Sequence, residues 1–107
     1  MQQGSRTILV VDDERSSRAI VVNKLSAAGM RVIEAANGRD GWEQFRTHQP
    51  DLVVSDLRMD GLDGLHLLGL VRGASTAPFV MMSSFGDIDC AVEAMKNGAQ
   101  DLVEFPK

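Results

Sequence analysis

The sequence predicts an α/β fold in which a doubly wound, five-stranded parallel sheet is flanked by helices. Strand-like and helix-like segments alternate along the chain, which is the pattern of a parallel sheet with helical crossovers. Two apolar runs also end directly on carboxylates, the first on Asp12 and Asp13 and the second on Asp56. Ligands of open α/β sheets bind beyond the carboxyl ends of the strands. We therefore expect strand order 2-1-3-4-5, with the three carboxylates at one edge of the sheet.

The first half of the chain supplies three strands and two helices. Short apolar runs predict strands over residues 7–11, 31–35 and 52–55. Helical spacing predicts a helix over 15–28, ended by Gly29. Its apolar residues are spaced for one helix face, and they are Ala19, Ile20, Val22, Leu25 and Ala28. Asn37 is placed to cap a second helix over 38–47, which ends before Pro50 because the residue before proline resists the α region.

The second half supplies two more strands and two more helices. We expect a short helix over 65–71, weakened by Gly69, and a strand over 78–82 that is apolar enough to be buried on both faces. A helix over 88–97 and a strand over 102–105 follow. Four helices on five strands leave one face of the sheet thinly covered. We therefore expect a fragment that lacks its last helix, or a partner on that face.

Composition limits the class of protein. The 107 residues are enough for one domain, which we expect to span 1–107. A net charge of −4 argues against nucleic acid as a direct partner. Cys90 is the single cysteine, which excludes an internal disulfide and fits a reducing compartment. There is no apolar stretch long enough to span a bilayer and no signal peptide, so we expect a cytoplasmic location without a membrane partner.

The strand-end carboxylates predict a metal site. Asp12-Asp13 alone would equally suit a turn or a helix cap, since Asp favours both. Asp56 at the end of a second strand makes that simpler interpretation much weaker. Three like charges held close together repel one another unless a cation neutralises them. Carboxylate oxygens suit Mg²⁺, which also keeps waters and phosphate oxygens as ligands. The sequence therefore predicts a magnesium site prepared for phosphoryl chemistry.

Four sequence motifs carry a family resemblance. VVDDERSSR, DLVVSDLRMDGLDGL, PFVMMSSFGD and NGAQDLVEFPK occur in this order. Together they resemble the receiver domain of bacterial two-component response regulators over nearly the whole chain, from Thr7 to Lys107. The resemblance implies a flavodoxin-like fold. The sequence around Asp56 and at 85–87 is most similar to receivers of the AAA+ activators that work with an alternative sigma factor. This similarity implies a role in transcription regulation.

The resemblance also implies roles for individual residues. Asp56 would be the phosphoacceptor, Asp12 and Asp13 would hold Mg²⁺ with the backbone carbonyl of Arg58, and Ser83 would hydrogen-bond the phosphoryl group. Such a domain is not an enzyme for other substrates, since it catalyses only its own phosphorylation and dephosphorylation. The implied partner is a sensor histidine kinase or a phosphotransfer protein, and a second copy of the chain is a candidate for a homodimer.

The chain departs from the family pattern at positions that matter for switching. Phe105 stands where the family has a lysine that pairs with the phosphoryl group. Lys107 lies two residues further on and could reach the site only if the chain bends back. Leu102 occupies the position of the switch aromatic, and Asp60 replaces a proline usual in the loop after the phosphoacceptor. These differences suggest an altered switch.

Two alternatives follow from these observations. The first is a pseudo-receiver, an interaction module that keeps the fold but is not switched by phosphorylation. The second is a phosphohydrolase of the haloacid dehalogenase kind, which also uses a strand-end Asp with Mg²⁺. That family needs Asp-x-Asp after its first strand, and Glu14 occupies the second position here, so we rank it last.

Overall fold

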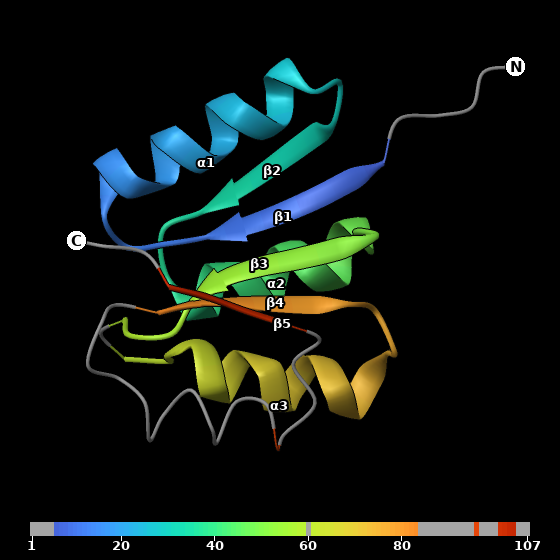
Figure 1. Ribbon diagram of the computed structural model, residues 1–107. Coiled ribbons are helices and arrows are strands. Elements are labelled where there is room, and N and C mark those ends of the chain that lie inside the picture. The colour runs from blue at the N-terminus through green and yellow to red at the C-terminus, as the bar shows by residue number, and fades with distance from the viewer. Residues whose placement is uncertain (1–5, 60, 84–95, 97–100, 105–107) are drawn as a thin grey trace, which may run out of the picture.

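The computed structural model describes residues 6–59, 61–83 and 101–104, together with Lys96. Five parallel strands form one sheet in the order β2-β1-β3-β4-β5, which confirms the predicted fold class and strand order (Figure 1). The strands are β1 Thr7–Val11, β2 Arg31–Ala35, β3 Leu52–Asp56, β4 Phe79–Ser83 and β5 Asp101–Glu104. The helices in the described part of the chain are α1 Arg15–Ala27, α2 Gly38–His48 and α3 Gly64–Ala74.

The central strand β1 explains why its sequence is apolar throughout. It pairs with β2 on one side and with β3 on the other, so it has no free edge. Four consecutive side chains are at most 3% exposed, and they are Ile8, Leu9, Val10 and Val11. The register pairs Val11 with Ala35 on one side and with Ser55 on the other. Because strands in register end at the same edge, the residues after Val11 and Ser55 meet there.

The face of the sheet covered by α2 and α3 contains the main hydrophobic core. Figure 1 shows α2 behind the strands and α3 along the β4 side. Alternate residues of β1 face these helices, so Leu9 and Val11 join a core cluster whose other members include Phe45, Leu67, Leu68, Val71, Phe79 and Met81. Trp42 and Phe45 on α2 stack with ring centroids 5.9 Å apart. This packing fixes α2 and α3 against the strand ends that carry the carboxylates.

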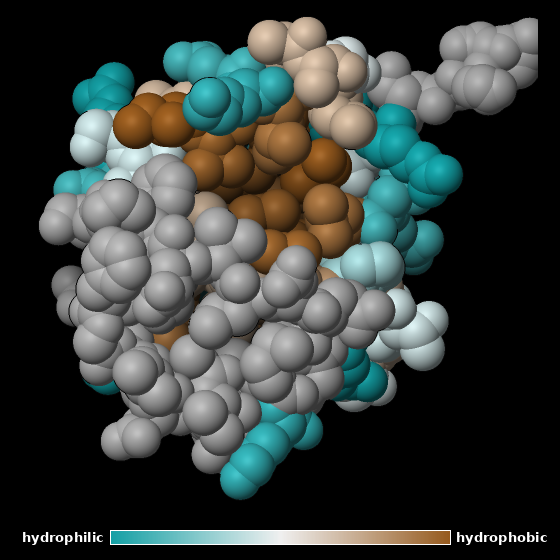
Figure 2. Space-filling view, viewed as in Figure 1, coloured by the Kyte–Doolittle hydropathy of each residue, from teal (hydrophilic) through white to brown (hydrophobic). Residues whose placement is uncertain are grey.

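The other face of the sheet is covered by α1 in the described part of the chain. Apolar side chains gather on this face below α1, over the central strands (Figure 2). Leu52, Val54 and Val80 are half-buried there, whereas their neighbours in β1 are fully buried. Within the described part of the chain, β3 and β4 are therefore less fully covered on this face than β1, and the prediction of thin cover, which also counted the helix over 88–97, stays a prediction.

The predicted packing face of α1 is partly wrong. Ile20 is 49% exposed, and Ala19 and Ala28 are exposed as well. The buried or half-buried residues are instead Ser17, Arg18, Val21, Val22 and Leu25. The helix is apolar on more than one side, so periodicity alone does not define its rotation. Arg18 donates hydrogen bonds to Asp12 after β1 and to Glu34 on β2, and these bonds orient the helix toward the two strands.

The helix ends follow local hydrogen bonding. The predicted cap of α2 is confirmed, because the Asn37 side chain accepts a 2.8 Å bond from the Asp40 backbone N–H. Gly29 follows α1 with φ +90°, as predicted for a residue that ends a helix. The third helix is longer than predicted, 64–74 rather than 65–71. Asp63 caps it by accepting from the His66 backbone N–H at 3.0 Å, a signal that the sequence analysis missed.

The last strands begin one residue away from their predicted positions. β4 spans Phe79–Ser83 and not 78–82, and β5 spans Asp101–Glu104 and not 102–105. The predicted helix over 88–97 lies, apart from Lys96, outside the described residues. Among the helices that are described, none has both the length and the apolar composition needed to cross a lipid bilayer.

Candidate functional site

Three carboxylates meet at the carboxyl edge of the sheet, as predicted. Asp12 and Asp13 directly follow β1, and Asp56 is the last residue of the neighbouring strand β3. One carboxylate oxygen from each residue lies within 4.8 Å of the other two. Asp12 and Asp56 are 0% and 2% exposed, whereas Asp13 is exposed. The site therefore has two buried carboxylates and one that solvent can reach.

The backbone around Asp12 is held by hydrogen bonds on several sides. Its N–H donates to the carbonyl of Ala35 in β2 at 3.1 Å, and its carbonyl accepts from Nη1 of Arg18 at 2.8 Å. Its Oδ1 accepts from the backbone N–H of Glu14 at 3.0 Å. Ser17 in turn donates its hydroxyl to the Glu14 carboxylate. These hydrogen bonds hold the β1–α1 loop against β2 and the first turn of α1.

The loop after Asp56 turns back against the end of β3. The N–H of Leu57 donates to the carbonyl of Met82 in β4 at 2.8 Å, which extends the strand pairing past Asp56. The N–H of Gly64 then donates to the carbonyl of Leu57 at 3.0 Å. A Cβ atom at position 64 would overlap the Asp56 carbonyl oxygen, so only glycine fits this close approach. The start of α3 is therefore packed directly on the strand end that carries Asp56.

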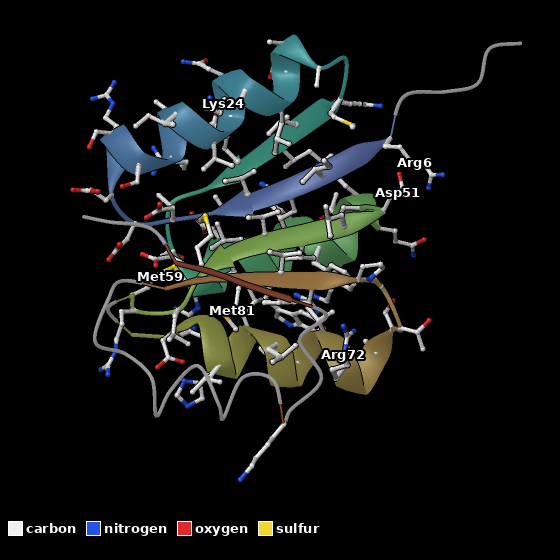
Figure 3. All side chains as sticks on the ribbon, viewed as in Figure 1. Arg6, Lys24, Asp51, Met59, Arg72 and Met81 are labelled. Carbon is white, nitrogen blue, oxygen red and sulfur yellow. The ribbon has the colours of Figure 1, made fainter. Side chains whose placement is uncertain are left out.

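A surface hollow opens beside the carboxylates. It is lined by Asp13, Arg58, Met59 and Asp63. Met59 is only 9% exposed and lies at the carboxyl edge of the sheet, whereas Arg6 and Asp51 lie at the opposite edge (Figure 3). The Arg58 side chain is exposed. The hollow therefore places a cationic side chain and an exposed carboxylate beside one opening.

The donor set fits a hard divalent cation. Three carboxylates, two of them buried, concentrate negative charge in a small volume. Oxygen ligands of this kind suit Mg²⁺, which binds one or two carboxylates and keeps its remaining positions for water or phosphate oxygens. Asp12, Asp13 and Asp56 are thus able to hold such an ion.

For the remaining predicted site residues, the structure describes the backbone alone or nothing. Ser83 is the last residue of β4, paired with Glu104, so its backbone lies at the same edge as Asp56; its side chain lies outside what the structure describes. Leu102 is in β5, paired with Met81. The switch positions Phe105 and Lys107, like Asp60 in the loop, lie outside the described residues.

Two features of the site were not found from the sequence. Arg18 carried no recognisable signal, because nothing in its spacing indicates that it binds the carbonyl of Asp12. Asp63 could have been found, since an Asp directly before a helical segment is a typical N-cap.

Comparison with known proteins identifies the family. The model of the response regulator receiver domain matches residues 8–106. The chain belongs to this family. The receiver is a signalling domain and not a family of enzymes, so the phosphohydrolase alternative has no support.

Individual relatives agree with this assignment. The chain is 37% identical over 106 residues to a probable transcriptional regulator ycf27 of Cyanophora paradoxa, covering 99% of this chain and 44% of that protein. It is 36% identical over 107 residues to the DNA-binding transcriptional regulator NtrC of Escherichia coli, covering 99% of this chain and 22% of that protein. The crystal structure of the receiver domain of NtrX from Brucella abortus matches with a TM-score of 0.87 and 37% identity, covering 94% of this chain and 86% of that one.

The relatives also bear on which receivers this chain resembles. Likeness to NtrC and NtrX is consistent with the predicted similarity to receivers of alternative-sigma-factor activators. The chain spans 31% to 44% of the length of the first curated relatives that it matches. One of those relatives, 35% identical over 109 residues, is the protein-glutamate methylesterase/protein-glutamine glutaminase of Natronomonas pharaonis and not a transcriptional regulator by name.

Proposed function

We propose that the chain is a phosphoacceptor domain in which Asp56 receives a phosphoryl group from a histidine kinase or phosphotransfer protein. The main support is the juxtaposition of Asp56 with Asp12 and Asp13, whose ligand oxygens lie within 4.8 Å of one another. The Asp56 carboxylate would attack phosphorus, forming an oxygen–phosphorus bond as the phosphorus–nitrogen bond to the donor histidine breaks. The product is an aspartyl phosphate, and the electron pair leaves with the histidine nitrogen.

The residues around Asp56 have distinct proposed roles. Asp12 and Asp13, with the backbone carbonyl of Arg58, would hold Mg²⁺. A bound Mg²⁺ neutralises charge on the transferring phosphoryl oxygens. Ser83 would donate a hydrogen bond to one of those oxygens. The fixed loops around Asp12 and Asp56 position the nucleophile, which is what phosphoryl transfer chiefly requires of a protein.

We also propose that residues 1–107 act as one receiver domain whose surface changes after phosphorylation. The change would alter contacts with an output domain, a partner or a second copy of the chain. Transcription is the proposed output, because several relatives are transcriptional regulators.

A titration with beryllofluoride, a mimic of the phosphoryl group, tests the proposal. In the presence of Mg²⁺, ¹⁹F NMR should show a bound signal in the wild type. The signal should be absent from Asp56→Asn, which is close in size and removes the carboxylate, and absent when Mg²⁺ is chelated. A bound signal that persists in Asp56→Asn would contradict Asp56 as the acceptor.

A pseudo-receiver is the second candidate, and one sequence observation favours it. Phe105 replaces the lysine that the family resemblance leads us to expect, which removes a cation for the phosphoryl group. Under this alternative the fold and partner surface remain but beryllofluoride does not bind. The same titration therefore separates the two candidates.

A further inference from the structure

Arg18 connects three parts of the molecule at the edge of the carboxylate site. Its Nη1 donates to the backbone carbonyl of Asp12 at 2.8 Å, and its Nε donates to the Glu34 carboxylate at 3.1 Å. Arg18 lies on α1, Asp12 follows β1 and Glu34 lies on β2. The Arg18 side chain is 17% exposed, whereas Glu34 is 51% exposed. The guanidinium of a mostly buried side chain thus joins the end of β1 to β2.

Both backbone polar groups of Asp12 are linked to β2, the N–H directly and the carbonyl through Arg18. Ala35 accepts directly from the Asp12 N–H at 3.1 Å. Glu34, the residue before it, acts on the Asp12 carbonyl through Arg18. A guanidinium suits this task because its planar fork offers several N–H donors in fixed directions. A lysine ammonium has no comparable fixed geometry.

We propose that Arg18, braced by Glu34, is a positioning residue for the cation site formed by Asp12, Asp13 and Asp56. This inference rests on the proposed function, because it assumes that the three carboxylates bind Mg²⁺. Arg18 acts by fixing the peptide that joins Asp12 to Asp13, so that both carboxylates are presented together. Groups that orient metal ligands in this way contribute to affinity although they do not touch the ion.

The positive charge of Arg18 should lower Mg²⁺ affinity, whereas positioning of the ligands should raise it. The direction of the change in affinity when Arg18 is replaced therefore tests the inference. A positive charge near a cation site repels the incoming cation. If Arg18 acted only as a nearby charge, its removal would strengthen Mg²⁺ binding. If it positions the ligands, its removal weakens binding. Arg15 is an exposed arginine three residues earlier at the start of the same helix, so it supplies a charge control on α1.

The experiment compares Arg18→Met with Arg15→Met. Mg²⁺ alone is titrated into each protein at low ionic strength, and the amide shifts of Asp12, Asp13 and Asp56 give the dissociation constant. We expect Arg18→Met to weaken binding by about tenfold, the lower end for residues that orient metal ligands. Arg15→Met should leave binding unchanged or tighten it by about twofold, as for a screened surface charge. Unchanged or tighter binding in Arg18→Met would overturn the inference.

Two further variants separate positioning from a general loss of stability. Arg18→Lys keeps the charge but not the fork, so its affinity should lie between those of the wild type and Arg18→Met. Glu34→Gln should weaken binding in the wild type but add nothing in the Arg18→Met background, because Glu34 acts through Arg18. Additive losses would overturn the role of Glu34 as a brace. The free energy of unfolding of each variant, measured by a urea melt without Mg²⁺, should not fall in the same order as the Mg²⁺ affinities.

The failure of the inference is distinguishable from the failure of the proposed function. A wild type without measurable Mg²⁺ affinity would overturn the metal site, and the inference with it. A wild type that binds Mg²⁺ as tightly as Arg18→Met would overturn the positioning role alone. If Arg18→Met does not fold, the Arg18→Lys and Glu34→Gln variants still decide the outcome.

Discussion

Gly64 packs directly against the backbone of Asp56, with no room for a side chain between them. A Cβ atom at position 64 would overlap the Asp56 carbonyl oxygen and lie 2.9 Å from the Cα of Leu57. Both obstacles are backbone atoms, which cannot rotate away as a flexible side chain could. The position of α3 is therefore tied to the strand end that presents the proposed phosphoacceptor. Gly38, at the start of α2, is packed in the same way against the backbone of Leu62, which lies in the loop between β3 and α3.

Gly64→Ala should destabilise the protein and disturb the site at the same time. The methyl group must displace the backbone of Asp56, so we expect a loss of about 2–3 kcal/mol, typical of overpacking. A urea melt gives the stability, and ¹⁵N shifts of Asp56 and Leu57 report the local change. Gly69→Ala is the matched control on the same helix, because among the described residues no atom outside that stretch of helix lies within 4 Å of its Cβ position. It should stabilise α3 by about 0.5–1 kcal/mol. Equal effects at the two positions would contradict this account of the packing.

Asp13→Ala should remove the response of thermal stability to Mg²⁺. If Mg²⁺ binds the folded site, as we propose, saturating Mg²⁺ should raise the melting temperature of the wild type by mass action. Asp13 is exposed, so its replacement should leave the fold intact. Glu43→Gln removes an exposed carboxylate on α2 and serves as the charge control. A Mg²⁺-dependent rise that persists in Asp13→Ala, measured by circular dichroism, would move the metal elsewhere.

Asn37→Ala should destabilise α2 by about 1 kcal/mol, the usual effect of losing an N-cap. The substitution leaves the Asp40 N–H without its 2.8 Å acceptor. Asn37→Asp keeps an acceptor and adds a negative charge at a helix N-terminus, so its stability should match that of the wild type. Urea melts of the three proteins make the comparison, and an equal loss in both variants would show that the cap contributes nothing.

The presence of Phe105 in place of the family's lysine predicts a weak conformational response to beryllofluoride. Without a cation at that position we expect beryllofluoride to bind at Asp56 but to produce small amide shifts in residues 88–97. Phe105→Lys should enlarge those shifts, because a cation there would interact with the phosphoryl group. Lys107→Ala should change little. Full shifts in the wild type that Lys107→Ala abolishes would show instead that Lys107 supplies the cation.

Much of the site was predictable because it depends on strand ends. Apolar runs that stop at carboxylates identify both the strands and the residues that follow them, and parallel register then brings Asp12, Asp13 and Asp56 together. The exact limits of β4 and β5 were not predictable from their own composition. Pairing sets them, since Asp56 aligns with Met82 and Ser83 aligns with Glu104.

The helices were harder to predict because polar contacts decide their details. Asp63 caps α3 at its N-terminus, and the helix spans 64–74, beyond the predicted 65–71, although it contains the exposed Gly69. The rotation of α1 about its axis depends on Arg18, which binds Asp12 after β1 and Glu34 on β2. Neither partner lies on the helix itself. Hydrophobic periodicity carries no information about such polar contacts, so it does not predict that Ile20 is exposed.

Labelling by a small acyl phosphate tests the central claim most directly. The protein is incubated with acetyl phosphate and Mg²⁺, and intact-mass spectrometry followed by peptide mapping locates any phosphoryl group. We predict a gain of one phosphoryl group on Asp56 that requires Mg²⁺ and is lost in both Asp56→Asn and Asp13→Ala. Stable folded protein that gains no phosphoryl group, or gains it equally in Asp56→Asn, would contradict the claim that this chain is a phosphoacceptor domain acting through Asp56.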